Sequence, residues 1–130
     1  MGRVEIDLPE SFDFSCQIPI RIGDINYGGH LGNDAVLALA HEARLLFLKQ
    51  YGFSEKDVGG CGIIMADAVV IYRSEAFYEQ TVNIEVGVVL GGKTSCDIVY
   101  QMTDTADERA IATVKTGIVF FDYERRRPAR

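Results

Sequence analysis

The pattern of hydrophobic and polar positions changes its period along the chain, and each period predicts a different kind of element. Apolar and polar residues alternate over residues 12–20, 80–90 and 93–103, which is typical of half-buried strands. Residues 62–73 form an almost continuous apolar run broken by Asp67, which predicts a strand in the centre of a sheet. Residues 109–122 form the last predicted strand. Pro19 lacks an N–H group and therefore suits an edge position or a bulge.

Residues 34–51 follow a helical period instead. One face of this predicted helix carries Ala35, Val36, Leu39, Ala43, Leu46 and Phe47, and Leu37, Leu45 and Leu48 widen it. A helix that is apolar around most of its circumference is usually enclosed, so we expect a curved sheet to wrap it. Asn33 occupies the predicted N-cap position, and Gly52 is the residue type that commonly follows the end of a helix.

The order of elements predicts the fold class. One strand and a long helix precede four strands, without the alternation of strands and helices that parallel sheets require. We therefore predict one α+β domain over residues 1–130, with a core at about 12–122 and an antiparallel sheet of about five strands, the last four in a meander. Gly91 and Gly92 suit a hairpin turn, and the basic tail at 124–130 is expected to be mobile.

Composition narrows the classes of function. The formal net charge of -6 argues against nucleic-acid binding, which needs a basic face. No apolar run approaches the ~18 residues of a membrane span. The three cysteines, Cys16, Cys61 and Cys96, are odd in number and lack metal-ligand spacing. We therefore expect reduced thiols in a cytoplasmic protein, with no metal site.

A glycine-rich stretch directly before the predicted helix carries the candidate chemistry. Gly28, Gly29 and Gly32 allow the backbone to bend sharply and to approach a ligand closely. His30 lies within this bend, and Asn26 precedes it. The start of a helix also presents backbone N–H groups without intrahelical partners. Such a place suits an oxyanion or a polarised carbonyl group.

Three motifs resemble the hotdog-fold acyl-CoA thioesterases of the 4-hydroxybenzoyl-CoA thioesterase type. They are Gly-Asp-Ile-Asn-Tyr-Gly-Gly-His-Leu-Gly-Asn at residues 23–33, Glu-Ala-Arg at 42–44 and Tyr-Arg-Ser-Glu-Ala-Phe-Tyr at 72–78. The resemblance implies a sheet wrapped around the helix and homodimers joined edge to edge, often paired into tetramers. It also implies an active site between subunits, where the N–H of Asn33 polarises the thioester carbonyl. Coenzyme A would be part of the substrate, with no separate cofactor.

The chain departs from this family at the acidic position of the motif, which is Asn26 here. An amide cannot ionise, so Asn26 can neither attack a thioester nor take a proton from water. We expect His30 or Glu42 to act as the base, and Asn26 to hold water or donate to the carbonyl oxygen. Glu42 lies some 13 Å beyond Asn33 along the helix axis, so only a second subunit would bring it close to His30. Gly32 and Val36 also replace an asparagine and an aromatic residue of the family motif.

The predicted catalytic residues are therefore Asn26, His30, Asn33 and Glu42. The predicted substrate-binding residues are Tyr27 and Gly29 in the same loop, with Arg73 and Lys93 as cations for the phosphates of coenzyme A.

Two alternatives to a thioesterase remain open. Gly-Asp-Ile-Asn followed by a histidine is also similar to the motif of hotdog (R)-specific enoyl-CoA hydratases, although His30 comes one residue late. The absence of an acid at Asn26 favours a non-catalytic binder of acyl-CoA or of an acyl-carrier protein, or a structural dimer. The acyl group and its carrier also stay open.

Overall fold

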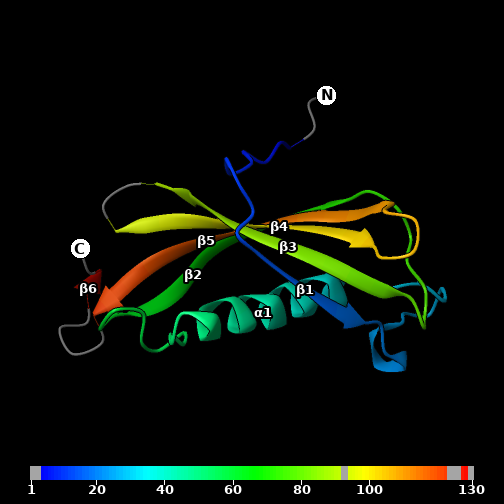
Figure 1. Ribbon diagram of the computed structural model, residues 1–130, viewed down its shortest axis with the longest axis horizontal. Coiled ribbons are helices and arrows are strands. Elements are labelled where there is room, and N and C mark those ends of the chain that lie inside the picture. Colours follow the sequence, from blue (N-terminus) through cyan, green and yellow to red (C-terminus); the bar gives the residue numbers. More distant parts are fainter. Residues whose placement is uncertain (1–3, 92–93, 123–126, 129–130) are drawn as a thin grey trace.

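A computed structural model describes residues 4–91, 94–122 and 127–128. Figure 1 shows a single long helix lying along one face of an antiparallel sheet, which confirms the predicted α+β arrangement. The elements are β1 (Phe14–Pro19), the short 3-10 helix η1 (Ile22–Asp24), α1 (Asn33–Gln50), β2 (Gly62–Tyr72), β3 (Thr81–Leu90), β4 (Ser95–Asp104), β5 (Ala110–Asp122) and β6 (Arg127–Pro128). Within these described ranges, no helix is both long and apolar enough to span a bilayer.

The strand order is β1-β3-β4-β5-β2, with β6 paired to β5. β3, β4 and β5 form the predicted meander, but β2 pairs with β5 at the far edge of the sheet. The prediction of a central strand at residues 62–73 is therefore wrong. Most side chains from Ile64 to Ala68 are exposed, so this apolar run does not reflect burial within one chain. β1 forms the other edge, so one of the two positions expected for Pro19 is confirmed.

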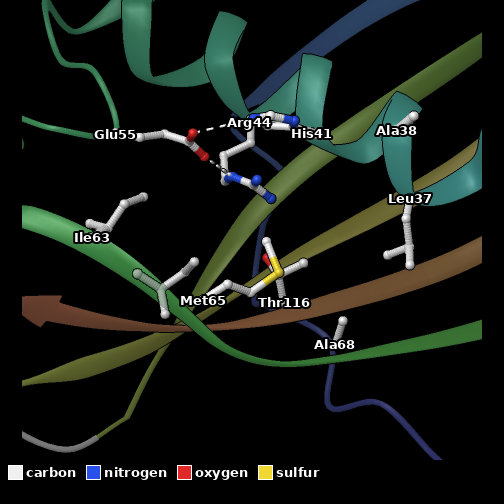
Figure 2. Close-up of a pocket in the computed structure, with 10 residues that line it drawn as sticks. Leu37, Ala38, His41, Arg44, Glu55, Ile63, Met65, Ala68 and Thr116 are labelled. Atoms are coloured by element: carbon white, nitrogen blue, oxygen red, sulfur yellow. Dashed lines mark hydrogen bonds and ion pairs between the residues drawn. The ribbon is translucent and has the colours of Figure 1, made fainter.

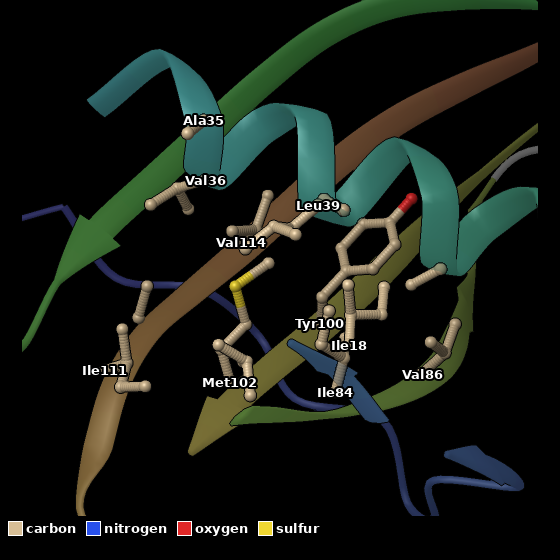
Figure 3. Packing of buried hydrophobic residues seen from close by; sticks show 14 of the residues in the cluster. Ile18, Ala35, Val36, Leu39, Ile84, Val86, Tyr100, Met102, Ile111 and Val114 are labelled. Atoms are coloured by element: carbon tan, nitrogen blue, oxygen red, sulfur yellow. The ribbon is translucent and has the colours of Figure 1, made fainter. Parts of the chain in front are cut away.

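The core lies between α1 and the inner face of the sheet (Figure 3). Alternate residues of each strand point toward the helix because successive side chains of a strand face opposite sides. Fully buried side chains at its centre are Leu39, Ile84, Val86, Tyr100, Met102 and Val114. The alanines Ala40 and Ala43 let the helix backbone approach the sheet closely, and both are completely buried.

The helix is less enclosed than its sequence predicts. Leu37, Leu45 and Leu46 are exposed, whereas the charged Arg44 is buried. Within one chain the sheet therefore covers only one side of α1. The other apolar residues remain available for contacts outside this chain.

Three further predictions concern the two ends of the helix and the C-terminal tail. Gly32, rather than Asn33, is the N-cap residue, and Asn33 is the first residue of the helix. Gly52 follows the end of α1 with a positive φ of 76°, as expected of a helix-ending glycine. In the basic tail, Arg127 and Pro128 pair with β5, whereas residues 123–126 and 129–130 lie outside the described residues, as does Gly92 of the predicted turn.

Candidate functional site

The glycine loop, residues 24–33, is held in a tight bend by its own hydrogen bonds. The N–H of Asn26 donates to the carbonyl oxygen of His30 at 2.9 Å, and the N–H of His30 donates to Oδ1 of Asn26 at 3.2 Å. Gly29 adopts a φ of +86°, a conformation that a residue with a side chain rarely takes. The loop closes where the N–H of Gly32 donates to the carbonyl oxygen of Asp24 at 2.9 Å. Asn26 and His30 are therefore fixed on the same small bend.

Asp24 anchors the base of this loop and is not available for chemistry. Its side chain is buried and accepts a hydrogen bond from the N–H of Arg21 at 2.9 Å. The Arg21 guanidinium lies 3.7 Å from the same carboxylate. The carboxylate of Asp24 therefore holds the entry to the loop.

The start of α1 presents backbone donors next to the loop. The first intrahelical hydrogen bond runs from the N–H of Val36 to the carbonyl oxygen of Gly32. Among the described residues, no acceptor pairs with the N–H groups of Asn33, Asp34 or Ala35. Unpaired N–H groups and the positive end of the helix dipole together favour an oxygen that carries negative charge.

A second segment, residues 73–80, lies against the glycine loop. The N–H of Leu31 donates to the carbonyl oxygen of Ala76 at 2.7 Å, which joins the two. This contact brings two side chains of the segment to His30. Glu75 Oε1 lies 3.5 Å from Nε2 of His30, and the ring of Phe77 meets the imidazole edge-on with 5.9 Å between ring centroids.

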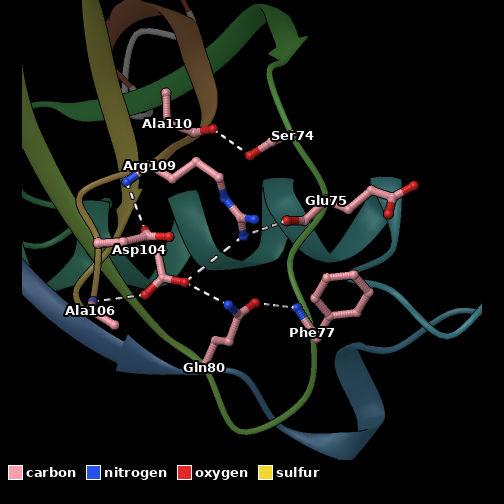
Figure 4. Close-up of polar contacts among 9 residues, drawn as sticks. Ser74, Glu75, Phe77, Gln80, Asp104, Ala106, Arg109 and Ala110 are labelled. Atoms are coloured by element: carbon pink, nitrogen blue, oxygen red, sulfur yellow. Dashed lines mark hydrogen bonds and ion pairs between the residues drawn. The ribbon is translucent and has the colours of Figure 1, made fainter.

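The 73–80 segment is itself fixed by a buried carboxylate (Figure 4). Asp104 accepts hydrogen bonds from Nε2 of Gln80 at 2.5 Å and from the N–H of Ala106 at 2.8 Å. Oε1 of Gln80 in turn accepts from the N–H of Phe77 at 2.6 Å. Arg109 adds a bond from Nη2 to the carbonyl oxygen of Glu75 at 2.8 Å. The residues facing His30 therefore depend on a network that reaches into β4.

His30 remains accessible despite these contacts. Its side chain is 36% exposed, and the partner carboxylate of Glu75 is 64% exposed. An imidazole takes up and releases a proton near neutral pH, and a carboxylate beside one ring nitrogen favours a proton on that nitrogen. The imidazole is therefore open to a ligand and lies on the loop that leads into the start of the helix.

Four of the predicted site residues lie in the same stretch of chain as His30. Asn26, Tyr27, Gly29 and Asn33 belong to the glycine loop or the first turn of the helix. The Tyr27 side chain is fully exposed, and the carbonyl oxygen of Asn33 accepts a hydrogen bond from the Tyr72 hydroxyl at 3.3 Å.

Arg73 directly follows that tyrosine and is exposed, and it lines a shallow hollow with Val4, Glu5 and Ile6 instead of joining the glycine loop. Lys93 lies outside the described residues.

Glu42 does not join this group. Its side chain is exposed on α1, and its charge acts on Cys16 of β1. Burial raises the pKa of the Cys16 thiol, and the nearby carboxylate of Glu42 raises it further. Glu42 therefore faces the β1 side of the sheet, away from β2, and the structure does not bring it to His30.

Glu75 and Phe77 are the neighbours of His30 that the sequence did not single out. Both lie in the motif at residues 72–78, but no spacing rule connects that motif to the glycine loop. No group of three or more metal-binding side chains occurs within the described part of the chain.

Comparisons with known proteins agree with this geometry. The model of the thioesterase-like superfamily matches residues 20–130. A 1,4-dihydroxy-2-naphthoyl-CoA thioesterase from Synechocystis superposes with a TM-score of 0.82 at 16% identity, over 89% of this chain and 87% of that one. A DHNA-CoA thioesterase from Staphylococcus aureus superposes with a TM-score of 0.78 at 19% sequence identity, over 89% of this chain and 78% of that one. A putative thioesterase from Pseudomonas aeruginosa superposes with a TM-score of 0.80 at 19% sequence identity, over 88% of each chain.

These similarities confirm the predicted hotdog fold, in which the sheet packs along one central helix. No curated protein matches the sequence.

Proposed function

Since this chain belongs to the thioesterase-like superfamily, we propose that it hydrolyses acyl-CoA thioesters, as the 4-hydroxybenzoyl-CoA type of hotdog thioesterase does. The observation that carries the proposal is the set of unpaired N–H groups at Asn33, Asp34 and Ala35, at the end of the loop that carries His30. Hydrolysis of a thioester needs an activated water and a stabilised oxyanion. The glycine loop and the first turn of α1 offer both within one short stretch of backbone.

The thioester carbonyl would accept a hydrogen bond from the N–H of Asn33. His30 would take one proton from a water molecule as the water oxygen adds to the carbonyl carbon. The N–H groups would hold the resulting oxyanion. The carbon–sulfur bond then breaks, and the departing thiolate receives the proton from His30. The products are a carboxylic acid and free coenzyme A.

Glu75 would orient the imidazole of His30 in this scheme. Its carboxylate lies 3.5 Å from Nε2 of His30 and so favours the tautomer that carries hydrogen on Nε2. Nδ1 is then the basic nitrogen. Asn26, which cannot ionise, would orient the water through its side-chain amide, and its position on the loop beside Gly32 suits that role.

We also propose that the active form is a homodimer joined through β2. In the described part of the chain, β2 pairs with β5 alone, which leaves its outer edge without a strand partner. Ile64 and Met65 on β2 expose apolar side chains, as does Leu37 on the neighbouring side of α1. An exposed apolar edge strand is a template for a second chain. The site would adjoin this seam, because Tyr72 at the end of β2 contacts the first turn of the helix.

The test is release of thiol from acyl-CoAs with short, long and aromatic acyl groups. His30→Ala is expected to lower kcat by at least about 100-fold, the usual contribution of a general base. Glu75→Gln should lower kcat by a smaller factor and shift the pH profile, because it alters the tautomer of His30. Glu79→Gln, in the same segment and exposed, is the matched control and should change neither quantity.

Three results would overturn the proposal. An unchanged kcat in His30→Ala would show that His30 is not the general base. Loss of enoyl absorbance without thiol release would identify a hydratase. Binding of every acyl-CoA in the panel without turnover would identify a non-catalytic binder.

A further inference from the structure

A cavity of about 200 Å³ lies at the C-terminal end of α1. Phe47 and Leu48 in the last turns of the helix line it, as does Tyr51, which directly follows the helix. The helix has 18 residues, so its two ends lie about 27 Å apart along the axis, at roughly 1.5 Å per residue. The cavity is therefore distinct from the candidate site at the start of the same helix.

The turn that ends α1 forms one wall of the cavity. The N–H of Gly52 donates to the carbonyl oxygen of Lys49 at 3.0 Å, and the N–H of Phe53 donates to the carbonyl oxygen of Leu48 at 2.8 Å. These two bonds are those of a Schellman motif, which Gly52 permits through its positive φ of 76°. The motif folds Phe53 back toward Leu48, and both side chains line the cavity.

The opposite wall is the inner face of the sheet. On β3 and β4, Val88 pairs with Ile98 and Leu90 pairs with Cys96. Cys96 also pairs with Ile118 on β5. Because alternate residues of a strand point to the same side, these residues form one continuous surface. The remaining lining residues are Val58, Ile63 and Phe120.

This lining offers a ligand almost no polar contact. Every described side chain in it is apolar except for the Tyr51 hydroxyl and the Cys96 thiol. Burial raises the pKa of the Cys96 thiol, and the charge of Asp97 raises it further, so the thiol stays uncharged near neutral pH. A hydroxyl or charged group inside the cavity would lose its hydrogen bonds to water without gaining a strong partner.

Two residues of the lining, Ile63 and Ile118, also face a larger hollow of about 490 Å³ between α1 and strands β2 and β5 (Figure 2). Leu37 and Met65 line that hollow and belong to the proposed seam with a second chain. Neither of them lines the cavity at the end of α1. The larger hollow therefore adjoins the seam, whereas the cavity is formed within one chain.

The polar side chains of the larger hollow already have partners. Nε of Arg44 donates to Glu55 at 2.7 Å, and Nη1 donates to the Tyr100 hydroxyl at 3.2 Å. Glu55 also receives a contact from His41 at 3.2 Å. Burial alone would raise the pKa of Glu55, but the hydrogen bonds and charges of Arg44 and His41 outweigh it and hold that pKa below its usual value. Since no buried side-chain nitrogen or oxygen of the described residues lacks a partner, nothing in this hollow calls for a ligand.

The size and the opening of the cavity select its ligand. Protein interiors contain few spaces larger than a water molecule, and an apolar space of about 150 Å³ takes up benzene in preference to water. Leu90 lines the cavity and is 85% exposed, so apolar surface continues from its interior to the outside. We propose that this cavity binds the end of an alkyl chain, whose polar end stays in solvent. This inference goes beyond thioester hydrolysis and does not depend on it.

The test is calorimetric titration with 1-hexanol, 1-heptanol, 1-octanol and 1,8-octanediol. Each further methylene group of the alcohols should raise the affinity about fourfold, the factor expected for burying one such group. The diol has the length of 1-octanol but carries a hydroxyl at both ends. It should bind about tenfold more weakly, because one hydroxyl would lose its hydrogen bonds to water inside the cavity.

A matched pair of variants locates the site. Val88 lines the cavity and is 37% exposed, so Val88→Phe should fill the space near its opening and weaken binding of 1-octanol. The next residue, Val89, faces the opposite side of β3 and lines a hollow beside Pro9 instead, so Val89→Phe should leave the affinity unchanged. Val58→Phe fills the same cavity from the loop after α1 and should act like Val88→Phe. Thermal unfolding of each variant without ligand checks that it is folded.

Nuclear Overhauser contacts show how the chain lies. Ile98 is 4% exposed and lies inside the cavity, whereas Leu90 lies at its opening. The terminal methyl group of bound 1-octanol should contact Ile98, and the carbon that bears the hydroxyl should not.

The proposal fails if 1-hexanol and 1-octanol bind equally, if the diol binds as tightly as 1-octanol, or if Val88→Phe and Val89→Phe have the same affinity. Binding of 1-octanol without a contact to Ile98 would also overturn it. All of these readouts are equilibrium affinities and contacts, so they remain informative whether or not the protein hydrolyses a thioester.

Discussion

The carboxylate of Asp104 should control both the stability of the protein and the geometry around His30. Asp104 is 3% exposed, and its two oxygens accept from Nε2 of Gln80 and from the N–H of Ala106. In Asp104→Ala both donors lose their charged acceptor inside the protein. Because Gln80 also holds the N–H of Phe77, the variant should loosen the segment that faces His30.

The expected magnitude follows from these two hydrogen bonds. A hydrogen bond to a charged group contributes about 1.5–3 kcal/mol, and Gln80 is partly exposed, so water replaces some of what is lost. We therefore expect Asp104→Ala to lower the free energy of unfolding by about 3 kcal/mol, or Tm by about 10 °C. Asp107→Ala is the control, because Asp107 is exposed and accepts a local bond from the N–H of Arg109.

Two measurements check this prediction. Urea unfolding of the two variants should differ by about 2–3 kcal/mol, since surface substitutions usually stay within about 0.5 kcal/mol of the wild type. Thiol release, assayed well below the Tm of the variant, should fall more in Asp104→Ala than in Asp107→Ala, because small displacements of positioning groups lower kcat. Equal unfolding energies in the two variants would refute the argument that the buried carboxylate holds the 73–80 segment.

Three further predictions concern other parts of the molecule. Glu55→Gln should lose a constant amount of unfolding free energy above about pH 5, and the difference from the wild type should shrink as pH falls below 4.5. This sign follows because the folded pKa of Glu55 is lowered, so its stabilisation is complete above the unfolded pKa and disappears through the folded one. Gly29→Ala should lose about 1–2 kcal/mol through its positive φ alone, since an added Cβ meets nothing within 4 Å, whereas Gly23→Ala should be neutral. Met65→Asp should convert the proposed dimer to monomers in sedimentation velocity, and an unchanged mass would contradict the β2 seam.

The sequence predicted most elements of this fold because their side chains obey simple periods. Ile84 and Val86 alternate with polar neighbours on β3, and Leu39 and Ala43 recur at helical spacing on α1, so each element could be assigned locally. The same rule misplaced β2. A continuous apolar run signals burial on both faces, but here Ile64 and Met65 are exposed on an edge strand. Local pattern does not distinguish burial within a chain from burial against a second chain.

The sequence likewise predicted some residues of the candidate site and missed others. Asn26, His30 and Asn33 follow each other closely in sequence, and one loop and one helix start are enough to bring them together. Glu75 reaches His30 only because the N–H of Leu31 pairs with Ala76, a contact between segments that are distant in sequence. The burial of Arg44 could not be predicted from the sequence either. The helical period describes the faces of α1, but it does not show that β4 and the loop after α1 supply hydrogen-bond partners for this side chain.

The central claim is that the unpaired N–H of Asn33 polarises the thioester carbonyl beside His30. A crystal structure with a non-hydrolysable acyl-CoA analogue tests it most directly. We predict the carbonyl oxygen at hydrogen-bonding distance from the backbone nitrogen of Asn33, and a water molecule between the carbonyl carbon and the imidazole of His30. An analogue bound with its carbonyl away from the start of α1, and with no path from that carbon to His30, would contradict the claim.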